Sequence, residues 1–140
     1  MTLVVDASVA WKWYVRETDS DLAEALVTGA EALVAPSIIV AEVCNAAWKL
    51  ARRGELSAAQ AESIAGDIAR QFDALIAPET LARAATSAAL ALDHPVYDCL
   101  YLVLAVEQDS QLVTADSRLF NKTRRTRWAR RVVDLSSVAV

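Results

Sequence analysis

Four carboxylates occupy the positions of this sequence at which chemistry is expected: Asp6, Glu42, Asp98 and Asp116. Asp6 directly follows a short apolar run that favours a β-strand, and Asp116 follows another by two residues. In a parallel sheet the carboxyl ends of all strands lie on one edge, where ligands bind. Carboxylates gathered there repel one another, and a hard divalent cation, Mg²⁺ or Mn²⁺, relieves that repulsion. Such a cation activates water and orients phosphodiesters, so the pattern predicts metal-assisted phosphodiester hydrolysis.

Each acid alone also has a structural interpretation. Asp6, Asp98 and Asp116 stand where a helix or turn is expected to begin, and Asp is a common helix N-cap. Glu42 follows an apolar stretch in which an unpaired carboxylate is costly to bury. Glu42 also shares a helical stripe with Asn45 and two basic residues, which is typical of a solvated face. The catalytic interpretation therefore depends on the four acids converging.

Three other polar side chains lie near these acids in sequence. Ser8 favours a local helix cap, and Thr114 fits an ordinary strand position. His94, the only histidine, precedes Pro95 in a predicted loop and is interpreted as structural or exposed. The chain accordingly lacks a histidine-based catalytic triad.

Short β-branched runs alternate with longer helical stretches, which indicates a parallel sheet covered by helices on both faces. Strands are expected at 2–5, 31–35, 72–76, 111–114 and 131–135, and helices at 7–16, 20–28, 37–53, 57–70, 78–93 and 98–106, with a short turn or helix after 116. The Ser37 hydroxyl is expected to cap one helix, and Ser57 with Gln60 forms a capping-box pattern. The predicted fold class is α/β, with about five short parallel strands.

Composition favours one folded domain over residues 1–140. Hydrophobic residues make up 55% of the 140 residues and charged residues 23%, which excludes a disordered chain. The chain shows neither a signal sequence nor an apolar run long enough to span a membrane, so we expect a cytoplasmic protein without a membrane partner. Cys44 and Cys99 lie in separate apolar runs, which predicts buried, reduced thiols rather than a disulfide or a zinc site.

Basic residues are concentrated near the end of an otherwise acidic chain. The net charge is −4, yet half of the 14 basic residues lie between positions 118 and 131 without an intervening acid: Arg118, Lys122, Arg124, Arg125, Arg127, Arg130 and Arg131. Such a segment can bind a polyanion locally, although a solvated surface has the same composition. Trp128, within it, is either a stacking face for RNA bases or a core residue.

Four motifs carry a resemblance to a known family: Val4-Val5-Asp6-Ala7-Ser8, Ala41-Glu42-Val43-Cys44-Asn45, Tyr97-Asp98-Cys99-Leu100-Tyr101 and Thr114-Ala115-Asp116-Ser117-Arg118-Leu119. In this order and context the chain resembles, over its whole length, the PIN-domain ribonucleases, and among them the VapC toxins of prokaryotic toxin–antitoxin pairs. The resemblance implies a three-layer α/β/α fold. It also implies that Asp6, Asp98 and Asp116 are the principal metal ligands and that Glu42 completes the acidic quartet.

The same resemblance implies an Mg²⁺- or Mn²⁺-dependent endoribonuclease acting on structured RNA of the tRNA or rRNA class. Ser8, Thr114 and Asn45 would support the acids, and the candidates to bind RNA are Arg118, Lys122, Arg124, Arg125 and Arg127. The family pattern further implies a homodimer and inhibition by a cognate VapB-type antitoxin. Hydrolysis through a metal-activated water would leave a 5′-phosphate and a 3′-hydroxyl.

Two other classes of protein compete with this interpretation. A catalytically silent PIN-like module that only binds RNA or a partner would keep the fold, although the intact acids argue against it. A receiver-type signalling domain also gathers acids at a sheet edge around Mg²⁺. That class needs a lysine directly after a late strand, and Lys12, Lys49 and Lys122 do not follow the predicted strands.

Overall fold

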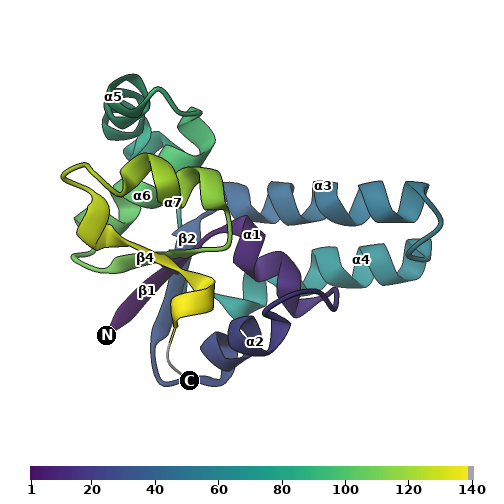
Figure 1. The fold of residues 1–140 in the computed structure, drawn as a ribbon. Coiled ribbons are helices and arrows are strands. Elements are labelled where there is room, and N and C mark those ends of the chain that lie inside the picture. The colour runs from purple at the N-terminus through teal and green to yellow at the C-terminus, as the bar shows by residue number, and fades with distance from the viewer. Residues whose placement is uncertain (139–140) are drawn as a thin grey trace.

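A sheet of five parallel strands forms the centre of the protein, as the computed structural model of residues 1–138 shows (Figure 1). The strands are β1 (Thr2–Val5), β2 (Ala32–Pro36), β3 (Ala74–Ile76), β4 (Gln111–Thr114) and β5 (Val132–Asp134), in the spatial order β3-β2-β1-β4-β5. All five predicted strands are present. Strand β3 begins two residues later than predicted, and Phe72 instead packs on Trp13, with ring centroids 5.6 Å apart.

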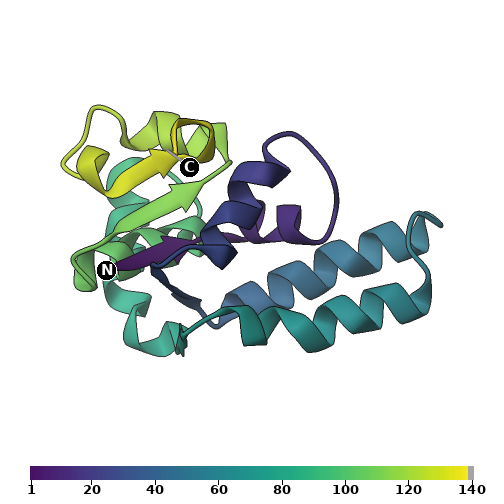
Figure 2. The ribbon, with the colours of Figure 1, turned by 90° about the horizontal axis from the view of Figure 1, so that it is seen from below.

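Helices flank this sheet and complete the predicted three-layer α/β/α arrangement. They are α1 (Ala7–Ala10), α2 (Ser20–Thr28), α3 (Ile38–Arg52), α4 (Ala58–Asp67), α5 (Ala82–Leu92), α6 (Val96–Glu107) and α7 (Ser117–Thr123). Helix α6 packs on β1, β2 and β4, and α5 packs along α6. Helices α3 and α4 form a hairpin that projects from the rest of the molecule (Figures 1 and 2).

Helix α6 is the central helix of the core. Every residue from Cys99 to Ala105 is buried, as its nearly uniform apolar sequence predicts for a helix covered on several sides. The helix begins at Val96, two residues earlier than expected, because Pro95 occupies its N-cap position. Asp98 therefore lies inside the first turn, and its interpretation as an N-cap is wrong.

The first helix is shorter than the predicted helix over 7–16. Helix α1 ends at Ala10, and a 3₁₀ turn over Trp11–Trp13 follows. The Trp13 indole N–H donates to the carbonyl oxygen of Ala23, 2.8 Å away, and this contact turns the chain toward α2. Tertiary packing thus ends a helix that the local sequence would have continued.

Two predicted caps have different outcomes. Ser57 and Gln60 form the reciprocal capping box, because the Gln60 backbone N–H donates to Ser57 Oγ at 3.0 Å and the Ser57 N–H donates to Gln60 Oε1 at 2.8 Å. Ser37 stands at the N-cap of α3, but its hydroxyl makes no capping hydrogen bond, so that prediction is wrong. The backbone N–H of Ser37 instead donates to the carbonyl of Ile76, at the end of β3.

Both cysteines are unpaired thiols, as predicted. Cys99 is buried, whereas Cys44 is partly exposed on α3, so the expectation of burial is wrong for Cys44. Within residues 1–138 we find no single helix long and apolar enough to cross a bilayer. Helices α5 and α6 meet that test only together, as a pair bent by 114°.

Candidate active site

The register between β1 and β4 places Asp6 at the carboxyl end of β4. Val5 pairs with Val113, so Asp6 lies beside Thr114, the last residue of β4. The Thr114 hydroxyl donates to Asp6 Oδ2 and the Ser8 hydroxyl donates to Asp6 Oδ1, both at 2.5 Å. Two hydroxyl donors from different elements therefore hold the Asp6 carboxylate in place.

The turn after β4 joins Asp116 to the same hydrogen-bond network. The backbone N–H of Ala115 donates to Ser8 Oγ at 2.9 Å, and that of Asp116 donates to Thr114 Oγ1 at 3.0 Å. Asp116 in turn accepts a hydrogen bond from the Arg118 N–H at 2.9 Å as the N-cap of α7. A single threonine side chain therefore links Asp116 to Asp6.

Asp6 is also a helix cap, because it accepts the backbone N–H of Val9 at 3.3 Å. The residue is only 5% exposed, and burial raises its pKa from 3.8 to about 6. Hydrogen bonds from Ser8, Thr114 and Val9 oppose this increase in pKa, whereas the negative charge of Asp98 adds to it. A buried acid coupled to another acid favours a bound cation or a bound proton.

Glu42 faces the site rather than only solvent. It is half-buried on α3, and its carboxylate accepts a hydrogen bond from the hydroxyl of Tyr101 on α6. Burial raises the pKa of Glu42, the Tyr101 hydrogen bond lowers it, and the charge of Asp98 raises it. The solvated-face interpretation is therefore wrong for Glu42, although it describes Asn45, whose side chain is exposed.

Tyr101 is a residue of the site that the sequence analysis did not single out. Its side chain is 99% buried, and burial together with the Glu42 carboxylate raises its pKa. The hydroxyl thus stays protonated and can donate to Glu42. The available sequence signal was its position one helical turn after Asp98, since residues three apart share a helix face.

Asp98 has a histidine partner. His94 Nε2 lies 2.6 Å from Asp98 Oδ2, and the His94 side chain is only 6% exposed. Of the two interpretations offered for His94, structural or exposed, its side chain is buried rather than exposed, and its partner is one of the four acids. The i, i+4 spacing was the signal for this contact.

The four acids differ in how closely the structure associates them. Asp6, Glu42 and Asp98 are electrostatically coupled, and Asp116 is joined to Asp6 through Thr114. Within residues 1–138 we find no group of three or more His, Cys, Asp or Glu side chains close enough to hold one metal ion. The donors nevertheless suit Mg²⁺ or Mn²⁺ in kind, because all are carboxylate oxygens and Asp6 is buried beside a like charge.

The basic segment is divided between the two edges of the sheet. Arg118 and Lys122 lie on α7, beside Asp116. Arg131 precedes β5, at the amino edge of the parallel sheet, where it pairs with Asp109 at 2.9 Å. The basic residues of this segment therefore do not all lie beside the acids.

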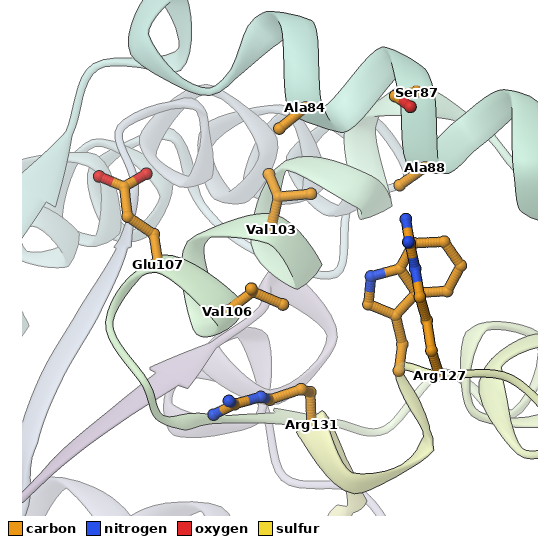
Figure 3. Close-up of a pocket in the computed structure, with 9 residues that line it drawn as sticks. Ala84, Ser87, Ala88, Val103, Val106, Glu107, Arg127 and Arg131 are labelled. Atoms are coloured by element: carbon orange, nitrogen blue, oxygen red, sulfur yellow. The ribbon is translucent and has the colours of Figure 1, made fainter.

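Arg127 also lies away from α7. Its guanidinium stacks on Trp128, 4.4 Å from the ring centroid. Both residues line a cavity of about 590 Å³ against α5 and α6, together with Arg131 (Figure 3). Trp128 is 8% exposed, so it is a core residue rather than an open stacking face for RNA.

Comparisons with known proteins agree with this geometry. The PIN domain family matches residues 3–125. Ribonuclease VapC3 from Pyrobaculum aerophilum is 37% identical over 124 residues, which are 87% of this chain and 95% of that protein. The crystal structure of PAE2754 from the same organism has the same fold, with a TM-score of 0.70 at 24% identity over 98% of this chain and 85% of that one.

These matches set aside the receiver-type alternative, because the matched family covers all four acids and four of the five strands. One family assignment accounts for the strand order, for the acids at the carboxyl edge of the sheet and for the extent of the matches. The chain belongs to the PIN-domain family and, within it, to the VapC group.

Proposed function

We propose that this protein is a divalent-metal-dependent endoribonuclease, the toxin of a VapBC-type pair, that cleaves structured RNA of the tRNA or rRNA class. The observation that carries the proposal is the buried Asp6 carboxylate, whose pKa burial and Asp98 raise to about 6 at the carboxyl edge of the sheet. The similarity to Ribonuclease VapC3 over most of both chains supports RNA as the substrate.

Asp6, Asp98 and Asp116 would hold Mg²⁺ or Mn²⁺, with Glu42 completing the set. When bound, such a cation activates water and stabilises charge on the leaving oxygen. Ser8 and Thr114 fix the Asp6 carboxylate through their hydroxyl groups. This preorganisation spares the acid a rotation on each turnover.

Tyr101 and α7 would serve the same reaction from two sides. Tyr101 orients Glu42 by donating a hydrogen bond from its hydroxyl to the carboxylate. Arg118 and Lys122 are exposed on α7, next to Asp116, and would bind RNA phosphates. Asn45 would contact the RNA or the metal-bound water from the exposed face of α3. Arg124 at the end of α7, Arg125 and Arg127 are further candidates for RNA contacts.

The proposed partners follow from the VapC group. Residues 1–140 would act as one nuclease domain in the cytoplasm, as a homodimer inhibited by a small VapB-type antitoxin. Co-expression with the adjacent short reading frame should yield a complex that elutes together and cleaves no RNA. Light scattering of the free protein should give twice the 15.1 kDa chain mass.

The decisive experiment is cleavage of bulk tRNA and rRNA by purified protein with Mg²⁺, with Mn²⁺, and with EDTA. We expect discrete fragments with either cation and none with EDTA. The fragments should carry 5′-phosphates. RNA ligase should therefore join them to an acceptor strand without prior phosphorylation. Asp98→Asn, purified in the same way, is the control for a contaminating nuclease. RNA binding without cleavage would instead identify the silent-module alternative.

A further inference from the structure

A groove of about 510 Å³ lies between α7 and the turn that joins α5 to α6. One wall is formed by Arg118, Asn121 and Lys122, which occupy one face of α7 because they are three and four residues apart. The other wall is the turn Asp93–Pro95, which includes His94. The groove is thus built by two segments that are distant in sequence.

One residue in each wall of this groove forms a hydrogen bond with one of the acids. His94 contacts Asp98 at 2.6 Å. On the opposite wall, the backbone N–H of Arg118 donates to Asp116 at 2.9 Å. Asp98 and Asp116 do not line the groove themselves, but each is in direct contact with a residue of one of its walls.

The charge of the groove favours an anion on the α7 side. Arg118 is 85% exposed, and its Nε lies 3.9 Å from Asp116 Oδ1, too far for a strong hydrogen bond. Lys122 is exposed, and no acidic side chain in residues 1–138 lies within ion-pair distance of it. Asp93 lines the turn side and carries the only negative charge among the groove residues.

We propose that this groove is a subsite for the sugar–phosphate backbone of the RNA strand next to the scissile bond, with Arg118 and Lys122 binding its phosphate oxygens. This inference rests on the proposed ribonuclease function. It separates these two cations from the rest of the basic segment, whose later members lie near the opposite edge of the sheet. Phosphate contacts of this kind position a strand without reading its sequence.

The test is binding of fluorescently labelled bulk tRNA to the full chain in EDTA, followed by anisotropy over a KCl series. Each phosphate contact that is lost should reduce the slope of log affinity against log salt by about 1. Lys122→Ala and Arg118→Ala should each bind about 3- to 10-fold more weakly at low salt, with shallower slopes. Lys122→Ala is the cleaner variant, because Arg118 also touches Asp116.

Arg83→Ala is the matched control. Arg83 is exposed near the start of α5, whereas the groove begins about 15 Å away, beyond the end of that helix. Unchanged slopes in both groove variants, an equal decrease in Arg83→Ala, or no tRNA binding by the unmodified protein would overturn the proposal. Normal groove-dependent binding without cleavage in Mn²⁺ would support the subsite and contradict the nuclease.

The His94–Asp98 contact carries a second inference. The His94 ring is held between the end of α5 and the first turn of α6, and its Nε2 reaches only one of the two Asp98 oxygens. The geometry points to His94 as a positioning residue that donates to Asp98 Oδ2 and fixes the orientation of a carboxylate that would hold the metal ion. Hydrogen bonds of this type commonly contribute 10- to 100-fold to metal affinity.

Mn²⁺ binding followed by electron paramagnetic resonance tests this role without using activity. His94→Phe should weaken Mn²⁺ binding about 10-fold, whereas His94→Gln, which keeps a donor, should restore most of the affinity. Thermal melting in EDTA shows whether each variant is folded. If His94→Phe does not fold, His94→Asn replaces it, because the asparagine side chain is too short to reach Asp98. Equal Mn²⁺ affinity in the unmodified, Gln and donor-deficient proteins would show that His94 only packs.

Discussion

Three of the four acids are held by side chains other than lysine or arginine. Asp6 is held by two hydroxyls, Glu42 by the phenol of Tyr101, and Asp98 by a histidine. Within residues 1–138 no lysine or arginine lies within ion-pair distance of these three carboxylates. The negative charge of the site is therefore left for a cation to neutralise.

Replacement of single acids separates a catalytic role from a structural one. Asp98→Asn and Asp116→Asn should each abolish most Mg²⁺-dependent RNA cleavage, because Asn lacks the charge that a hard cation requires. Melting temperatures in EDTA should hold or rise, since one like charge is removed. Gel assays and calorimetry on the same preparations measure both quantities.

The alanine variants provide the control for the caps. Asp116→Ala should lower the free energy of unfolding by about 1 kcal/mol, because Asp116 caps α7. Asp98→Ala should not cause this loss of unfolding free energy, because Asp98 lies inside the first turn of α6 and does not cap the helix. Full cleavage by both alanine variants would refute the catalytic assignment.

The raised pKa of Asp6 predicts a pH dependence of stability in the metal-free protein. Because the folded pKa is about 6 and the ordinary value is 3.8, the folded state binds the proton more tightly. The free energy of unfolding should therefore fall as pH rises from 4 to 6, by about 2 of the roughly 3 kcal/mol that the full pKa shift represents. Urea titrations in EDTA should show this decrease in the unmodified protein and not in Asp6→Asn. An equal pH dependence in both proteins would contradict the assignment to Asp6.

Among the elements, the segment after α7 departs furthest from its appearance in the sequence. Its run of cations suggests one surface, but the chain turns back after α7, so that Trp128 enters the core and Arg131 reaches the amino edge of β4. The first part of the segment therefore lies beside the acids, and the last part at the opposite edge of the sheet.

Trp128→Ala measures how much the burial of Trp128 contributes to the free energy of unfolding. Truncation of a buried tryptophan typically costs about 3 to 5 kcal/mol of unfolding free energy, and Trp128 is 8% exposed. We expect a loss of that size in urea, with tRNA affinity unchanged at temperatures where the variant is folded. Trp128→Phe, which keeps an aromatic ring, should recover much of the stability. A loss of RNA affinity in a fully stable Trp128→Ala protein would indicate a stacking role instead.

Across the whole molecule, the site joins parts of the chain that are far apart in sequence. Asp6 follows β1, Asp116 follows β4, Glu42 lies on α3 and Asp98 on α6. A cation bound by these side chains stabilises only the folded state, so it should raise the melting temperature of the complete protein.

At a Mn²⁺ concentration 100 times its dissociation constant, linkage predicts about 2.7 kcal/mol of added stability. Scanning calorimetry over a Mn²⁺ series should show the melting temperature rising with concentration. Asp98→Asn should show a much smaller rise at the same concentrations. A melting temperature independent of Mn²⁺ in the unmodified protein would contradict the proposed metal site.

The sequence by itself determined the fold class and the strands, and it indicated the four acids as candidates for the site. Short β-branched runs followed by Asp are local features, and the burial of α6 follows from an apolar sequence that no solvated helix would carry. In a parallel sheet, placing Asp6 and Asp116 at strand ends already puts them on one edge.

The tertiary structure alone decided which side chains support the acids and where the cations lie. Tyr101 meets Glu42 across 59 positions of sequence, and Thr114 meets Asp6 across 108, because the register of packed strands and helices sets these distances. The direction of the chain after α7 likewise depends on the burial of Trp128. Local sequence encodes the preferences of an element, whereas contacts between elements depend on how the whole core packs.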